Sequence, residues 1–277
     1  WNLEDSVSDM RSRIFLLFQA MFVGILLIFA SLPVFYTQRE FFKRDYAAKI
    51  YSWAPFGFTL VLVEIPYVIF ITTLTFVALY WASGLNKQND SDSAGYLYFA
   101  MVIFTSYCVA FGQSVASLCS HILQAIIVLP IVVLFLFLFP GVLNPPDSMP
   151  YFWSSWMYPL VPTRYYLEGA VTNVLNSVVL TCSNADLIKF PAPPNQTCFE
   201  YTFEFMLNAT GYIANPNATG AEWCEYCLYS GGPDYFENFI GWHYEYRWRN
   251  VGIVACYWFA AVLVTVAFTW VNRKATR

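Results

Sequence analysis

Side chains capable of chemistry are few and scattered in this sequence. The chain has two histidines, His121 and His243, and neither falls with Ser and Asp on a recognisable frame for a catalytic triad. The phosphate-cradling loop G-x-x-x-x-G-K-[ST] does not occur in the 277 residues. We therefore expect this segment to have no enzymatic activity, to hold no cofactor and to bind no ATP by itself.

Glu64 is the one acidic or basic side chain inside a long apolar segment. A charged side chain in hydrocarbon costs about 2.5–3.5 kcal/mol on insertion scales, so Glu64 should face protein or a water-filled cavity. A role in coupling or packing fits its position one-third of the way along that segment. A proton relay is the alternative reading. His121, in a tight turn between apolar segments, is expected to be a solvated loop residue.

Four of the seven cysteines, Cys182, Cys198, Cys224 and Cys227, cluster late in the chain. Cys224-x-x-Cys227 with His243 suggests a zinc site, but one histidine at loose spacing is a weak ligand set, and we expect no metal. An even cysteine number in an oxidising compartment is more often disulfide-bonded. Four cysteines permit three pairings. We favour Cys182 with Cys227 and Cys198 with Cys224, which would close one compact cap, although the even count does not select it.

Composition identifies lipid as the main surrounding of the chain. The residues are 58% hydrophobic and 12% charged, about half the charged share of an ordinary soluble domain. The net charge of −4 and the pI near 5.2 give no basic surface for nucleic acid, which we exclude as a partner. The first residue is Trp1 and no signal peptide follows it, so the sequence reads as a piece of something longer.

Apolar segments of the length that a bilayer requires predict five membrane-spanning helices. The sequence therefore predicts an all-α membrane protein, a polytopic bundle of five transmembrane helices. The second segment is too long for one perpendicular crossing, so we expect residues 50–56 to lie at the interface. The predicted spans are residues 14–36, 50–83, 94–118, 122–143 and 251–271.

The distribution of basic residues predicts the orientation. Seven of the 14 Lys and Arg fall in the connection 38–49 and the tail 273–277, which should therefore be cytoplasmic. The other connections contain four glycosylation sequons and the clustered cysteines, and these belong outside the cell. We expect a plasma-membrane protein whose amino end is extracellular and whose carboxy end is cytoplasmic. The sequons begin at Asn89, Asn195, Asn208 and Asn217.

The long connection 144–250 should be a folded extracellular element, because it far exceeds ordinary loop lengths. Residues 151–158 and 163–180 read as two short helices, too short to cross the membrane and return. They predict a re-entrant helical hairpin in the outer leaflet, its aromatic residues at headgroup depth. The remainder of the connection should be the disulfide-linked extracellular loop.

Residues 39–49 read as an amphipathic helix on the cytoplasmic surface. Phe42, Tyr46 and Ile50 recur at i, i+4 and i+8, while Arg39 and Lys43 lie on another face. The pattern fits either a connector resting on the membrane or a docking surface for a cytosolic partner.

Several motifs resemble, in order and spacing, fungal pleiotropic drug resistance transporters of the ABC G subfamily. They include Gln38-Arg-Glu40, Tyr51-Ser-Trp53, Val63-Glu-Ile-Pro-Tyr67 and Arg247-Trp-Arg-Asn250. A further motif, Pro146-Asp-Ser-Met-Pro-Tyr-Phe-Trp153, resembles the segment that follows a membrane helix in that family. The four-cysteine loop matches the second membrane domain. The resemblance implies that residues 1–277 form a single ABC-2 type transmembrane domain lacking the first of its six helices.

The resemblance also implies an exporter of hydrophobic drugs or lipids. The full-length chain would contain two nucleotide-binding domains that use ATP and Mg, and a first transmembrane domain, all partners of this segment. Residues 39–49 would be the coupling helix. The residues expected to serve coupling are Arg39, Glu40, Lys43 and Glu64.

In that family the first and fourth spans of this segment line the substrate cavity. Packing between helices or against lipid is the alternative for each matching residue. The first span departs from the family pattern, because residues 29–35 lack its usual Asn and Gln, and this leaves the cavity polarity open. The matching positions are Phe18, Met21, Phe22, Ile25, Leu134 and Phe137 for the cavity, and Val142 and Leu143 for an outer valve.

Two other classes of protein are compatible with the composition. A receptor or adhesion protein would use the glycosylated loop and would transport nothing. A membrane-embedded acyltransferase is disfavoured, because no histidine within the membrane accompanies a polar partner.

Overall fold

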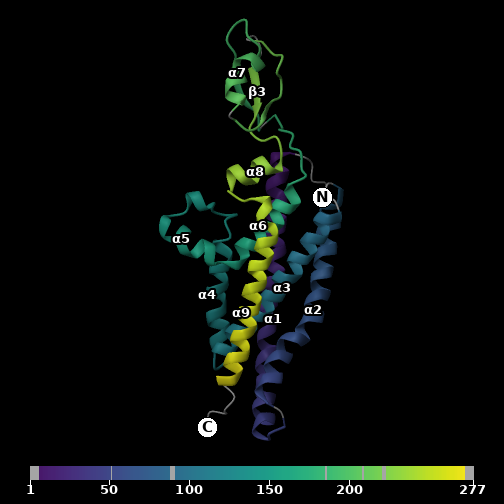
Figure 1. Cartoon of the computed structure of the whole chain (residues 1–277), viewed down its shortest axis with the longest axis vertical. Helices are drawn as coiled ribbons and strands as arrows, with labels where there is room; N and C mark the ends of the chain where they lie inside the picture. The colour runs from purple at the N-terminus through teal and green to yellow at the C-terminus, as the bar shows by residue number, and fades with distance from the viewer. Residues whose placement is uncertain are drawn as a thin grey trace.

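The computed structural model describes residues 6–50, 52–87, 91–184, 186–207, 209–219 and 223–271. Long helices form a bundle, and a small cap projects from one end of it (Figure 1). Four of the described helices are long and apolar enough to cross a membrane. These are α1 (Val7–Ala47), α2 (Trp53–Ala82), α3 (Ser91–Leu118) and α9 (Arg247–Val271).

The fourth predicted span is shorter than expected. Helix α4 (Ile122–Leu138) has 17 residues, which gives a length of about 25 Å against about 30 Å of hydrocarbon. The predicted span ran on to residue 143. It ends early because Pro140 cannot continue a helix and Gly141 takes a φ of +93°. The helical bundle is confirmed, with four full-length helices and this shorter one.

Helix α1 continues through the segment predicted to be a separate surface helix. Residues 39–47 form its last turns, and the chain reverses only at Lys49, which has a φ of 59°. No Gly or Pro interrupts residues 34–47, so the hydrogen-bond ladder continues. Phe42 stacks on Phe56 of α2 with ring centroids 4.2 Å apart, so the apolar face packs on protein rather than on lipid.

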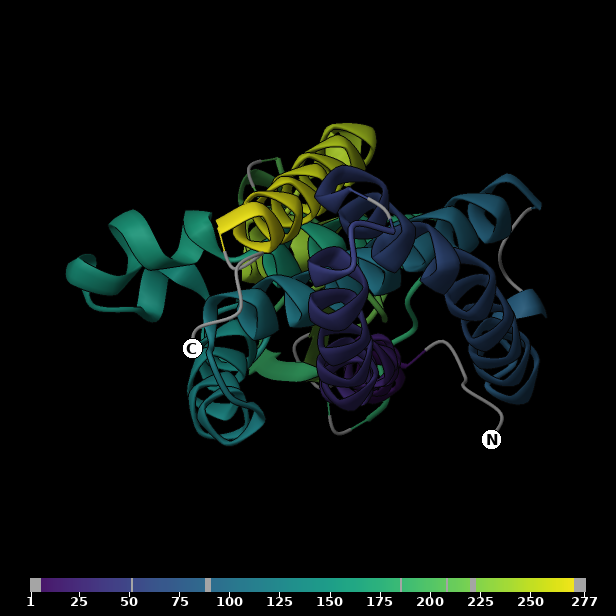
Figure 2. The ribbon, with the colours of Figure 1, turned by 90° about the horizontal axis from the view of Figure 1, so that it is seen from below.

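Helix α3 occupies the centre of the bundle. It packs against α1, α2, α6 and α9, and Figure 2 shows α2 and α4 at opposite edges with α1 between them. Small residues allow the close approach, as expected where lipid gives no hydrophobic drive for helices to associate. A Cβ added at Gly112 would lie 2.7 Å from the carbonyl oxygen of Ile28 in α1.

A helical hairpin follows α4. It comprises α5 (Tyr151–Leu160) and α6 (Pro162–Leu175), and α5 projects from the side of the bundle while α6 is almost wholly buried (Figure 1). Thr163 Oγ1 donates to the Leu136 carbonyl oxygen at 2.7 Å and so fixes α6 to α4. The second helix was predicted to reach residue 180. It ends at Leu175, and the chain beyond it forms a β-bridge from Val179 to Gly231.

The cap is a three-stranded antiparallel sheet with one helix beside it. The strands β1 (Ile188–Pro191), β2 (Tyr212–Ile213) and β3 (Trp223–Cys227) are ordered β1-β3-β2, with Phe190 opposite Cys224. Disulfides join Cys182 to Cys227 and Cys198 to Cys224, which is the nested pairing. The remaining helices are α7 (Cys198–Met206), α8 (Gly232–Phe239) and the 3-10 turns Leu85–Lys87, Pro146–Ser148 and Tyr244–Tyr246.

The substitution Gly112→Ala should destabilise the bundle. The added methyl group would press on the α1 backbone, and overpacking of this kind lowers the free energy of unfolding by about 1–3 kcal/mol. Thermal denaturation of the full-length protein in detergent would measure it. Gly95→Ala is the matched control in the same helix, because nothing lies within 4 Å of its added Cβ. Equal midpoints for the two variants would contradict the tight α1–α3 contact.

Candidate functional site

Three aromatic rings join α1 to α4. Phe137 of α4 lies with its ring centroid 5.4 Å from that of Phe18 and 4.2 Å from that of Phe22, both in α1. The side chain of Phe22 remains 44% exposed, so the cluster has an open apolar surface. We call Phe18, Phe22 and Phe137 the aromatic cluster. Leu134, one turn before Phe137, is also exposed.

Three of the predicted cavity residues, Phe18, Met21 and Ile25, are buried and add little to this surface. All three belong to the core of the bundle, and of these Phe18 also contacts the ring of Phe137. Nearly every residue of this stretch is apolar, so hydropathy does not distinguish the core side of α1 from its open side. The apolar residues that α1 and α4 leave exposed include Phe15, Leu26, Ile127 and Ile131, which sequence reasoning missed.

The predicted valve residues follow the end of α4. Val142 packs against the core and Leu143 is exposed. At Gly141 an added Cβ would lie 2.9 Å from the ring of Tyr158, so the chain passes close to the hairpin here. A valve at this point stays a prediction.

At the opposite end of the bundle, α1 holds the turn between α3 and α4. The hydroxyl of Tyr36 lies 3.1, 3.3 and 3.2 Å from the carbonyl oxygens of Ala116, Cys119 and His121. Arg39 Nη1 donates to the Cys119 carbonyl oxygen at 2.8 Å. The last carbonyl oxygens of a helix lack hydrogen-bond donors within the helix, and the side chains of Tyr36 and Arg39 supply these donors. We call Tyr36 and Arg39 the turn clamp.

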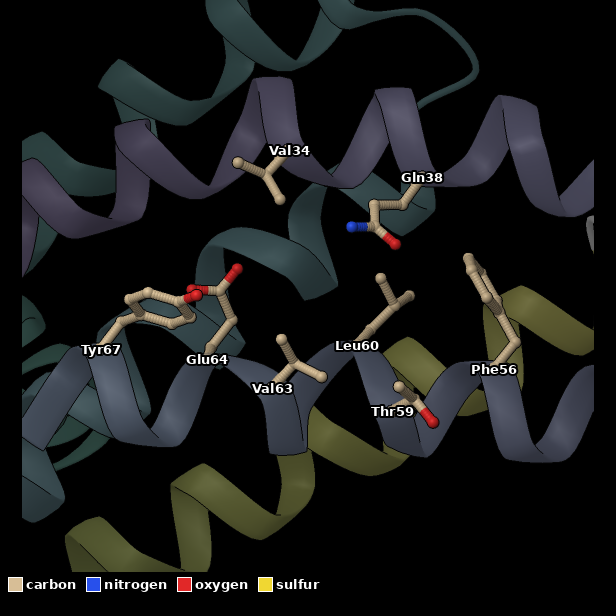
Figure 3. A pocket seen from close by; sticks show the side chains of 8 residues that line it. All are labelled: Val34, Gln38, Phe56, Thr59, Leu60, Val63, Glu64 and Tyr67. Carbon is tan, nitrogen blue, oxygen red and sulfur yellow. The ribbon is translucent and has the colours of Figure 1, made fainter.

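The other predicted coupling residues are separated from one another. Glu40 is exposed and Lys43 half-buried on the last turns of α1. Glu64 lies in α2 and lines a pocket of about 350 Å³ together with residues of α1 (Figure 3). Glu64 forms no ion pair with any described residue, so the four predicted coupling residues do not form one cluster.

A buried polar cluster fixes the hairpin to α9 near the cap. Glu168 Oε2 lies 3.9 Å from Arg164 Nε, and the guanidinium of Arg164 lies 3.9 Å from the ring centroid of Tyr158. Burial raises the pKa of Glu168, and the neighbouring Arg164 opposes that shift. Asn250 of α9 is fully buried beside them. The sequence indicated only the i, i+4 spacing of Arg164 and Glu168.

Two of the four sequons can be placed on the cap. Asn195 and Asn217 are exposed. Asn89 and Asn208 lie outside the described residues. Cys224 and Cys227, considered above as metal ligands, are both held in disulfides.

The substitution Tyr36→Phe should loosen the turn between α3 and α4. Loss of one hydrogen bond costs about 1 kcal/mol, which corresponds to about fivefold more frequent opening of the turn. Cys119 in the turn is a free thiol, so its alkylation by N-ethylmaleimide, followed by mass spectrometry of its peptide, reports this opening. Tyr46→Phe is the control, because the Tyr46 hydroxyl has no hydrogen-bond partner among the described residues. Identical rates in the two variants would rule out the clamp.

Comparison with known proteins gives a family for the chain. The family model for the ABC-2 type transporter matches residues 1–175, and that for the CDR ABC transporter matches residues 227–277. ABC transporter G family member 14 of Dictyostelium discoideum is 43% identical over 100% of this chain and 19% of its own length. Brefeldin A resistance protein of Schizosaccharomyces pombe is 32% identical over 98% of this chain and 18% of its own length.

The chain thus spans about a fifth of the length of the curated relatives that it matches. The two family models match both ends of the chain, and the relatives also cover residues 176–226 between them, which form most of the cap. This chain therefore belongs to the ABC-2 type transporter family, in the pleiotropic drug resistance branch of the G subfamily that its motifs resemble.

Proposed function

We propose that this chain is the second membrane domain of an ATP-driven exporter that moves hydrophobic drugs or lipids out across the plasma membrane. The aromatic cluster between α1 and α4 carries the proposal, because its open surface is apolar and positioned by two packed helices. Such a surface binds bulky hydrophobic ligands through buried area, without strict polar recognition. The relative named for resistance to brefeldin A supports a drug as cargo.

The remaining parts of the exporter would belong to the longer polypeptide. Its nucleotide-binding domains would hydrolyse ATP with Mg, and its first membrane domain would complete the passage beside the aromatic cluster. The last turns of α1, which contain Arg39, Glu40 and Lys43, extend past the turn between α3 and α4 and supply charged side chains for contact with a nucleotide-binding domain. The turn clamp would then pass a displacement of these turns to α4.

The proposed orientation puts the cap outside the cell. Four basic residues lie between positions 39 and 49, at the end of the bundle remote from the cap, and the positive-inside rule favours the cytoplasm for that end. The exposed sequons and the two disulfides of the cap suit an oxidising extracellular space.

The substitution Phe22→Ala should weaken drug export. Burying an aromatic side chain against a ligand contributes about 1.5–3 kcal/mol, so the apparent KM for a bulky hydrophobic drug should rise about tenfold or more. Efflux of a fluorescent hydrophobic substrate from cells that express the full-length protein measures this. Phe259→Ala is the control, an equally large truncation at an exposed position of α9, a helix that contributes no residue to the cluster. An unchanged KM for Phe22→Ala would remove the cluster from the passage.

Replacing Arg39 and Lys43 together by Glu should uncouple ATP hydrolysis from drug binding. The change reverses two charges on the proposed contact and removes the hydrogen bond from Arg39 to the turn. We expect basal hydrolysis by the purified full-length protein to persist while drug stimulation is lost. Arg11→Glu, at the cap end of the same helix, should retain stimulation. Full drug stimulation in the double variant would argue against a coupling role.

A further inference from the structure

The pocket between α1 and α2 contains polar groups that the fold leaves unused. Four polar side chains line it, Gln38 from α1 and Thr59, Glu64 and Tyr67 from α2, and the rest of its lining is apolar. In Figure 3 the Glu64 carboxylate and the Gln38 carboxamide point into the space between the two helices from opposite sides. None of the four side chains has a hydrogen-bond partner among the described residues.

The pocket is separate from the aromatic cluster. Gln38 lies 16 residues beyond Phe22, which is about 24 Å along the helix axis and on a different face of α1. The pocket faces α2, whereas the aromatic cluster faces α4, and these helices lie at opposite edges of the bundle (Figure 2). A ligand in the pocket therefore occupies a second site.

The position of the pocket gives access from lipid. Gln38 is level with the turn clamp, at the end of the bundle remote from the cap, and Val34 lies one turn deeper in the bundle. Val63 and Tyr67 on the wall are 52% and 63% exposed, so the pocket opens on the outside of α2. The volume of about 350 Å³ falls at the small end of the range for small-molecule sites. A molecule half embedded in the leaflet can therefore enter sideways.

The charges select the kind of ligand. Glu64 is one carboxylate, and no Lys or Arg lines the pocket, so an anion would be repelled. A neutral ligand would leave the carboxylate unpaired in a largely apolar setting, which is costly. A divalent metal would need several more oxygen ligands than one carboxylate offers. A protonated amine on an apolar body satisfies both the carboxylate and the apolar wall.

We propose that this pocket is a binding site for small hydrophobic amines, with Glu64 as the counter-ion of the protonated nitrogen. The carboxamide oxygen of Gln38 and the hydroxyl of Tyr67 accept further N–H groups, and Phe56, Leu60 and Val63 hold the apolar body. The amine enters from the leaflet on the clamp side of the bundle. Binding here does not require that the amine be exported.

Photoaffinity labelling of the full-length protein in lipid nanodiscs tests the site. The probe is a primary alkylamine with a diazirine in its chain, whose protonated nitrogen carries three N–H groups, and the comparison probe has a hydroxyl in place of the amino group. Labelled peptides are identified by mass spectrometry. We expect the amine to label residues 34–38 and 56–67 at least about tenfold more than the alcohol, the difference that one charge-assisted hydrogen bond produces.

Substitutions at Glu64 separate binding from folding. Glu64→Gln should reduce labelling by the amine to the level of the alcohol, and Glu64→Asp, which keeps the charge, should largely restore it. Glu40→Gln is the matched control, because it removes one negative charge from an exposed position on the same pair of helices. Labelling of the pocket by the amine in Glu40→Gln should equal the labelling in the protein with the natural sequence.

Three results would overturn the site. They are equal labelling by amine and alcohol, labelling that Glu64→Gln leaves unchanged, and cross-links from a photoreactive residue at Val34 to a protein segment outside residues 1–277, which would show the pocket filled by protein. Drug efflux is measured in parallel. Failed labelling with intact efflux rejects the pocket alone, whereas specific labelling without efflux rejects the exporter alone.

Discussion

The absence of water in a bilayer determines how this bundle is built, because each polar group in it needs a partner within the protein. Neighbouring helices provide these partners. Thr72 of α2 and Thr105 of α3 bond at 2.7 Å, and Gln113 Nε2 of α3 donates to the Leu60 carbonyl oxygen. Since α3 contacts most of the other helices, these bonds and its small residues fix the arrangement on which the aromatic cluster and the turn clamp depend.

The same requirement explains why the polar side chains with contacts between helices lie in a few places. Near the cap, the buried Glu168 and the partly buried Arg164 lie together and fasten the hairpin. At the other end, Tyr36 and Arg39 supply hydrogen bonds to a helix terminus. Glu64 differs from both, because the described residues give it no partner, and this makes it the natural place for a ligand. The polar residues at the two ends of the bundle thus hold helices together, whereas Glu64 is free to bind a ligand.

The sequence predicted the five long apolar helices, since a bilayer demands about 20 apolar residues for each crossing. Their bounds were less accurate, because α1 extends past its predicted span at both ends and α4 ends before residue 143. The sequence did not predict which side of a helix is buried. Met21 and Phe22 are both apolar, yet one lies in the core and the other is open. The turn clamp was also invisible, because Tyr36 bonds to backbone carbonyls 80 or more residues away, and backbone atoms leave no pattern in side-chain identity. Charge alone identified Glu64, but not the groups around it.

Helix α1 contains one proline, Pro33, between its contact with α3 and the turn clamp. Proline removes one hydrogen bond from the helix ladder and makes a local weak point. On the cap side of Pro33, Ile28 and Ser31 of α1 pack closely against Gly112 of α3. On the other side, Tyr36 and Arg39 bind the turn between α3 and α4. Pro33 therefore marks the point where α1 is expected to bend most easily, between two anchored parts of the helix. A displacement of the far end of α1 would then reach the α3–α4 turn through the turn clamp, and the aromatic cluster on the other side of Pro33 would stay in place.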